Sequence, residues 1–135
     1  MTTINEAKVQ ISTYFLDKWE DITPVSWDNT DDNYAKGKKP WIRASIRMST
    51  GGQHSLGSPG NRLFTRKGYL IFQVFTPTGE ATEESDKLVQ KILDIFDGAI
   101  VGDVNIINGS PTYVKQESKW FQQNVEFTII FSEIK

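Results

Sequence analysis

Few side chains of this 135-residue chain could carry out chemistry, and none has the spacing that catalysis needs. The only histidine, His54, lies in a glycine-rich stretch at 49–62, and the chain has no cysteine to join it in a zinc site or catalytic triad. Acid–base catalysis needs two carboxyl groups in different environments of one cleft. The carboxylates at 31–32, and Asp94 with Asp97, are predicted to be solvated surface charge instead. We therefore predict no catalytic residue, no metal site and no cofactor.

The glycine-rich stretch, "STGGQHSLGSPGNR", does not match a phosphate-binding loop. Such a loop closes on Lys and then Ser or Thr at the start of a helix, whereas a strand pattern follows here. We predict a mobile hairpin tip that becomes ordered against a neighbouring molecule, because glycine makes ordering costly. The residues expected to form this assembly loop are Gly52, His54, Leu56, Pro59 and Arg62. A tolerated insertion without function is the alternative.

Composition indicates one folded domain. Hydrophobic residues make up 38% of the chain and 16 residues are aromatic (4 Trp, 4 Tyr, 8 Phe), so disorder is not expected. The net charge of −2 gives no general attraction to nucleic acid or to anionic membranes. No apolar stretch approaches the roughly 20 residues that span a bilayer, and the first residues lack a signal-peptide core. We expect a protein of the cytoplasm with no membrane partner.

Two amphipathic helices are predicted. Thr3, with a glutamate three residues later, forms a capping-box pattern that predicts a helix over 4–19. Its apolar stripe is Ile4, Ala7, Ile11, Tyr14, Phe15 and Trp19. A second helix, 82–97, is expected to start at a Thr82 cap and to end through a left-handed Gly98. Its apolar stripe is Leu88, Val89, Ile92, Leu93 and Phe96.

Alternating patterns between the helices predict a sheet. Strands are expected at 24–28, 41–49, 63–76, 100–107, 112–118 and 120–131. Strands 41–49 and 63–76 form a long hairpin, and Gly68 indicates a bulge or a close backbone approach. Apolar residues on both faces of 63–76 predict that this strand is covered on two sides, and "NGSP" at 108–111 predicts a turn. The fold class is α+β: a mostly antiparallel β-sheet or sandwich with two packed helices and a long β-hairpin.

Charges are divided between two predicted elements. The basic hairpin face would comprise Arg43, Arg47, Arg66 and Lys67, together with Arg62 from the loop. The acidic helix face would comprise Glu83, Glu84, Asp86 and Asp94. One basic and one acidic element in a nearly neutral chain suit head-to-tail self-association. A nucleic-acid surface and an ordinary mixed surface are the alternatives.

Segment order points to a family. "RKGYLIFQVFTPTGEATEESDKLVQKILDIFDG", followed by "ESKWFQQNVEFTIIFSE", resembles the tail terminator (tail-completion) proteins of long-tailed, lambda-type bacteriophages. The shared features are a strand that opens with glycine, a P-x-G turn, an amphipathic helix ending near Phe96, and a final strand that opens at Trp120. The resemblance covers 41–135 well and 1–40 in outline. It departs at "GEA", where a second glycine would be expected.

The resemblance implies a structural virion protein and not an enzyme. It implies a homo-oligomer, a hexameric ring that caps the tail tube, ends its polymerisation and joins the head. Expected partners are further copies of the chain, the major tail-tube protein and the head-completion protein, with DNA only passing through the lumen. The protein would be assembled in the host cytoplasm and end in the virion tail. A head–tail connector or tail-tube subunit is one alternative. A small ligand-binding module with an aromatic platform of Trp27, Trp41 and Trp120 is another.

Overall fold

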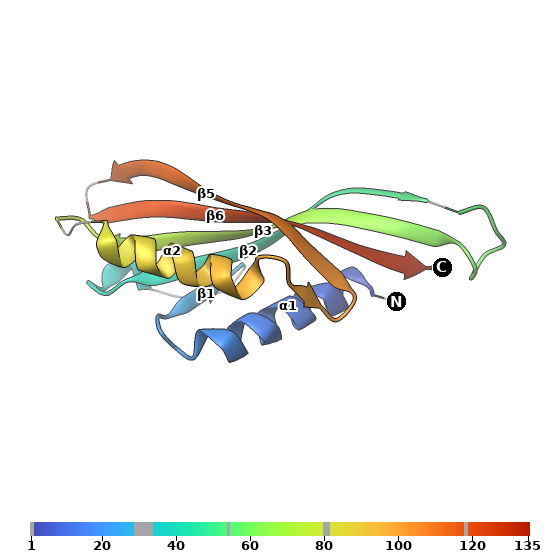
Figure 1. Ribbon diagram of the computed structural model, residues 1–135, viewed down its shortest axis with the longest axis horizontal. Helices are drawn as coiled ribbons and strands as arrows, with labels where there is room; N and C mark the ends of the chain where they lie inside the picture. Colours follow the sequence, from blue (N-terminus) through green and yellow to red (C-terminus); the bar gives the residue numbers. More distant parts are fainter. Residues whose placement is uncertain (1, 29–33, 54, 80–81, 118) are drawn as a thin grey trace.

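The computed structural model describes residues 2–28, 34–53, 55–79, 82–117 and 119–135. Two α-helices pack against one six-stranded sheet (Figure 1), which confirms the predicted α+β class. The elements in chain order are α1 (Ile4–Trp19), β1 (Val25–Trp27), a 3-10 turn η1 (Tyr34–Lys36), β2 (Trp41–Gln53), β3 (Leu63–Pro77), α2 (Glu83–Phe96), β4 (Ile100–Val101), β5 (Val104–Glu117) and β6 (Trp120–Ile134).

The sheet is mostly antiparallel, with the strand order β1-β2-β3-β6-β5-β4. Only the short edge strand β1 is parallel to its neighbour, pairing Val25 with Ile42. The two central strands, β3 and β6, pair along their whole lengths, from Leu63 opposite Ile134 to Pro77 opposite Trp120. These long strands give the molecule its elongated shape (Figure 1).

The core lies between the helices and one face of the sheet. Alternate residues of β2, β3 and β6 point to this face, and a chain of aromatic rings connects them to the helices. The ring centroids of Phe15 and Phe72 are 4.8 Å apart, and those of Phe72 and Phe96 are 5.5 Å apart. Phe96 in turn lies 5.5 Å from Phe127 of β6. One aromatic layer therefore holds α1, α2 and the central strands together.

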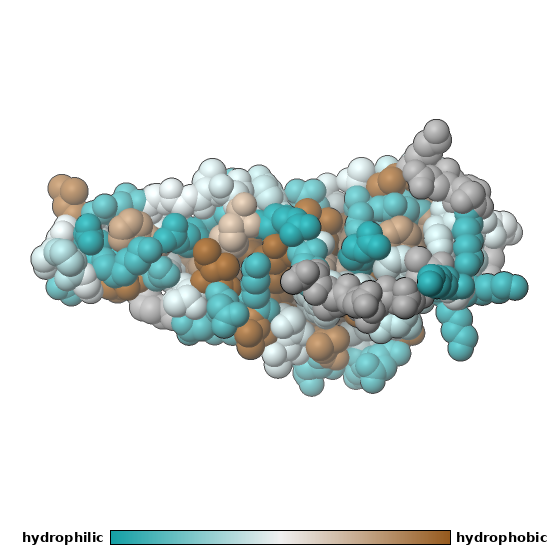
Figure 2. All heavy atoms as spheres, turned by 180° about the vertical axis from the view of Figure 1, so that it is seen from behind, coloured by the Kyte–Doolittle hydropathy of each residue, from teal (hydrophilic) through white to brown (hydrophobic). Residues whose placement is uncertain are grey.

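None of the described helices lies on the opposite face of the sheet, so the prediction that 63–76 is covered on two sides is wrong. On β3, Leu70, Phe72 and Val74 are buried, whereas Tyr69 and Ile71 on the other face are only half-buried. Leu70, Phe72 and Val74 belong to the core, where Phe72 contacts Phe15 of α1 and Phe96 of α2. Seen from behind the view of Figure 1, hydrophobic side chains form small patches among hydrophilic ones (Figure 2).

The helix ends follow the predictions in part. The Thr3 side chain accepts a hydrogen bond of 3.2 Å from the backbone amide of Glu6, as the capping box requires. Thr82 makes no such bond: its backbone already has helical angles, φ −73° and ψ −5°, whereas a capping side chain needs an extended residue. Gly98 leaves α2 with φ 71°, as predicted. Ile4 is 41% exposed and lies outside the core.

Gly68 marks a bulge, as predicted. The pairing of β2 with β3 shifts between Met48 and Thr50, opposite Gly68. A Cβ atom at Gly68 would lie 2.5 Å from the carbonyl oxygen of Arg47 and 3.2 Å from the Cα atom of Met48. Only glycine lets the two backbones approach this closely.

The "NGSP" motif is a second bulge, and its prediction as a turn is wrong. Strand β5 continues through it, and the pairing with β6 shifts between Ile107 and Ser110. Asn108 takes the left-handed angle φ 57°. A Cβ atom at Gly109 would collide with the Asp97 side chain and lie 2.7 Å from the Phe127 ring. The motif therefore bends one strand against the end of α2 instead of reversing the chain.

Candidate functional site

Beyond Gly68 the β2–β3 hairpin extends past both helices. We call residues 49–53 and 63–67 the arm, and 55–62 its tip. In Figure 1 the arm and its tip form the right-hand end of the molecule. The predicted loop at 49–62 is therefore too long, because 49–53 belong to β2 and Gly52 pairs with Thr65 inside the sheet. The C-terminal end of β6 supports the arm on its other side.

The tip is a hydrogen-bonded turn that presents one leucine. The Leu63 amide donates to the Ser55 hydroxyl at 2.9 Å, and the Asn61 amide donates to the Ser58 carbonyl at 3.0 Å. Gly60 has φ 92°, which other residues rarely adopt. Leu56 is 96% exposed, the highest value among the described large hydrophobic residues. Pro59 is also exposed, while His54 lies outside the described residues.

Basic side chains gather on Phe64 where the tip joins the arm. The guanidinium carbons of Arg62 and Arg66 lie 6.0 and 5.8 Å from the ring centroid, and the Lys135 ammonium lies 5.3 Å from it. Glu133 is the acidic residue here, 3.9 Å from Arg66 and 3.7 Å from Lys135. Among the described residues, the buried Nε atoms of Arg62 and Arg66 have no hydrogen-bond partner. The base of the tip therefore carries excess positive charge.

The predicted basic hairpin face is divided by the structure. Arg66 and Lys67 are adjacent in β3, so they point to opposite faces of the sheet. Arg66 shares the face of the helices, and its side chain passes over Gly51, where a Cβ atom would lie 2.7 Å from Nη1. Lys67 is exposed on the other face, with Arg43 and Arg47 of β2.

Two of these arginines are already engaged within the chain. Arg47 forms two hydrogen bonds to Asp28, at 2.9 and 3.2 Å, and the Ser45 hydroxyl donates to the same carboxylate at 3.0 Å. Arg43 stacks on the Trp41 ring, with its guanidinium carbon 5.2 Å from the centroid. The basic residues therefore do not form one continuous binding surface.

The predicted acidic helix face is also mixed. The four carboxylates Glu83, Glu84, Asp86 and Asp94 are all exposed on α2. Lysines lie among them, and Glu83 pairs with Lys87 at 3.0 Å. Asp86 accepts a hydrogen bond from Gln123 at 2.9 Å. Simple pairing of one basic face with one acidic face is therefore not a sufficient description of self-association.

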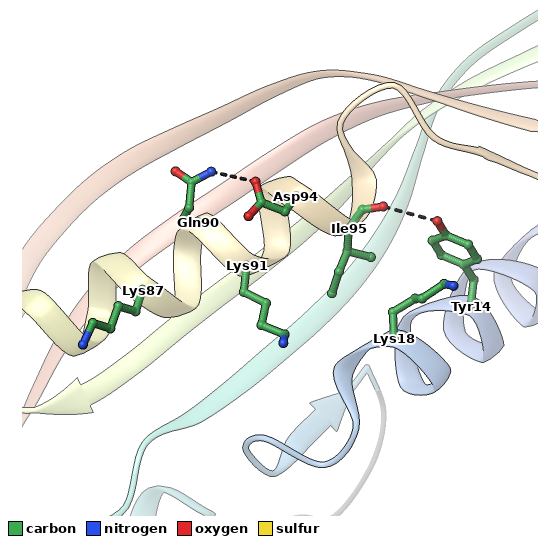
Figure 3. A pocket seen from close by; sticks show the side chains of 7 residues that line it. All are labelled: Tyr14, Lys18, Lys87, Gln90, Lys91, Asp94 and Ile95. Atoms are coloured by element: carbon green, nitrogen blue, oxygen red, sulfur yellow. Dashed lines mark hydrogen bonds between the residues drawn. The ribbon is translucent and has the colours of Figure 1, made fainter.

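An open groove of about 530 Å³ lies between α1 and α2 (Figure 3). Its polar residues are three lysines, Gln90, Asp94 and Tyr14. Asp94 accepts a hydrogen bond from Gln90 at 2.8 Å, and the Tyr14 hydroxyl donates to the Ile95 carbonyl at 3.4 Å. No nucleophile with a neighbouring base is present among these lining residues, so the groove does not have the composition of an active site.

A second groove, of about 410 Å³, runs beside α1 and is more apolar. We call it the α1 groove. It lies between α1 and the strands β1 and β2, and its lining residues are Lys8, Val9, Ser12, Leu16, Trp27, Asp28 and Ile46. Val9 and Leu16 are 54% and 48% exposed, although both are aliphatic. The helix therefore presents apolar side chains on a second side, away from the core.

Within the described ranges, no group of three His, Cys, Asp or Glu side chains could hold a metal ion. The described helices are too short or too polar to span a membrane. The candidate functional features described above are two surfaces: the arm with its tip, and the α1 groove.

Comparison with known families identifies the type of protein. The profile of a phage tail terminator protein family matches residues 10–125, which is most of the chain. The chain belongs to this tail terminator family. It is therefore a structural component of the phage tail, and it works among other tail and head proteins of the virion. The predicted resemblance is confirmed.

Solved structures share the fold of this chain. Matches were found to 29 chains of known structure. One of them has a TM-score of 0.66 and 14% sequence identity, and the match covers 95% of the terminator and 96% of the other chain. At this identity the likeness concerns the fold alone. The search of curated proteins found no match.

The predicted aromatic platform is not formed. In the terminator, Trp41 contacts Trp120 on the face of the sheet without helices, with ring centroids 6.3 Å apart. Trp27 points to the other face, where its ring lies 6.2 Å from that of Phe15. Sequence reasoning also missed the α1 groove. The available signal was that Val9 and Leu16 are apolar but lie off the buried stripe of their helix.

Proposed function

We propose that this terminator forms a closed ring of identical subunits, six by the family resemblance, at the end of the tail tube. One side of the ring binds the tube and ends its polymerisation, and the opposite side binds the head-completion protein. DNA passes through the lumen of the ring. Assembly takes place in the host cytoplasm, and the phage is long-tailed. The family match carries this proposal.

The shape of the subunit supports a ring. The arm and the α1 groove are different surfaces on one elongated chain, so contacts between them would be heterologous. Heterologous contacts close into a ring when the rotation between copies divides a full circle. A ring of this kind has two unlike sides, as a cap between a tube and a head requires.

Light scattering on the purified protein tests the ring. The expected species has a mass near six subunits and does not grow as concentration is raised. A tail-tube subunit would grow into filaments instead, and that result would overturn the proposal.

We propose that the tip of the arm contacts a neighbouring subunit or the tube through Leu56, Pro59 and Arg62. Gly52 and His54, the other two residues of the predicted assembly loop, are close to the tip in sequence. Replacing 55–60 with two glycines tests this role. The tip lies outside the hydrophobic core, so the melting temperature should stay near that of the unaltered protein while tube capping is lost. Unchanged capping would show that the tip is a tolerated insertion.

A further inference from the structure

We propose that the tip of one subunit docks, through Leu56, into the α1 groove of a neighbouring copy. This inference rests on the proposed ring and names its contact. The two surfaces match in chemistry. Leu56 is 96% exposed, and the apolar part of the groove is formed by Val9, Leu16, Trp27 and Ile46. This groove, of about 410 Å³, is open to solvent, so a side chain from another molecule can reach it.

The arm cannot fill the groove of its own chain. Ile46 lines the groove and Gln53 ends β2 at the base of the tip. The six residues 47–52 lie between them, so the two positions are seven strand steps apart, roughly 23 Å at about 3.3 Å per step. The strand carries the tip away from the groove, so a tip that docks there has to come from another copy.

Charge favours the same pairing. At the base of the tip, Arg62, Arg66 and Lys135 gather around the Phe64 ring, and one carboxylate, that of Glu133, lies among them. The end of α1 beyond Leu16 holds three exposed carboxylates against one lysine within 17–21. Opposite charges beside an apolar contact orient the two partners and reject the reverse alignment.

The turn within the tip also suits docking. Hydrogen bonds to Ser55 and Ser58 and the left-handed Gly60 define the shape of the tip before any contact is made. These contacts favour a preformed tip over the mobile tip that the glycines predict, and a preformed loop loses less conformational freedom on binding. Each subunit would give one tip and receive one, so the contact repeats around the ring without a free end.

Cysteine pairs test the contact directly, because the chain has none of its own. Ser58→Cys, at an exposed position of the tip, is combined with Ser12→Cys in the α1 groove, so that Leu56 stays in place. The matched control combines Ser58→Cys with Ser110→Cys, an exposed serine on β5. Tails are purified from phage carrying each pair and treated with a short bis-maleimide. The groove pair should give a ladder of cross-linked copies. Equal cross-linking in the control, or none with the groove pair, would overturn the docking.

A second variant gives an independent measurement. Leu56→Ser should reduce the terminator retained on purified tails at least tenfold. The control, Ile100→Ser, removes a hydrophobic side chain that is 70% exposed at another place and should leave retention unchanged. Equal retention of the two variants would overturn the proposal. If phage with the groove cysteine pair have tails of normal length but no cross-links, the docking is refuted and the capping function is not. If tails made with the unaltered protein are overlong, the capping function itself is refuted.

Discussion

Substituting Gly68 with alanine should destabilise the protein by about 1–3 kcal/mol, the usual cost of forcing extra atoms into a packed site. The new Cβ atom would lie 2.5 Å from the Arg47 carbonyl oxygen, which belongs to the backbone of β2. A flexible side chain could move aside, but here two paired strands would have to separate. Gly52→Ala is the matched control, because nothing lies within 4 Å of its Cβ position.

Urea unfolding followed by tryptophan fluorescence measures both variants, since Trp19 and Trp41 are buried and will report on the loss of the core. Gly52 has no positive φ, so alanine fits its backbone conformation. Alanine there should be neutral or should stabilise the protein by up to about 1 kcal/mol, because it lowers the conformational entropy of the unfolded chain. A Gly68→Ala variant as stable as the unaltered protein would refute the close approach at the bulge. Equal losses in both variants would show a general need for glycine in the strands, and not a specific contact.

Three further predictions concern stability and use the same urea titration. Thr3→Ala should lower the free energy of unfolding by about 0.5–2 kcal/mol, because it removes the cap of α1. Thr82→Ala removes no capping bond and should change the free energy of unfolding by less than about 0.5 kcal/mol. Equal effects of the two substitutions would contradict the assigned caps. Phe15→Ala should cost about 3–5 kcal/mol, because this fully buried ring contacts both helices and the sheet, and a loss below 1 kcal/mol would refute its central place. Asp28→Asn should lower the free energy of unfolding by no more than about 1 kcal/mol, because its partner Arg47 is 62% exposed and screened by solvent. A larger loss would show that Asp28, Arg47 and Ser45 form a buried network.

Local patterns predicted the elements well. The capping box and the apolar spacing predicted α1 at its observed bounds, and alternation predicted which face of β2 is buried. Gly68 was correctly predicted to mark a bulge or a close approach. These features depend on neighbours along the chain or on the simple period of a helix or strand.

Features that depend on distant contacts were predicted poorly. "NGSP" has the composition of a turn, but pairing with β6 and packing of Gly109 under α2 keep it in the strand. Strand pairing likewise extends β2 into the glycine-rich stretch. Alternation alone could have shown that Arg66 and Lys67 cannot share a face. The α1 groove needs β1 and β2 beside the helix, and no local pattern specifies that arrangement.

The length of tail tubes tests the central claim most directly. Purified tube subunits are polymerised with and without the terminator, and tube lengths are measured by electron microscopy. If the protein caps the tube, adding it should stop growth and leave short tubes with a ring-shaped density at one end. Tubes of the same length distribution in both samples, with no terminal density, would contradict the account.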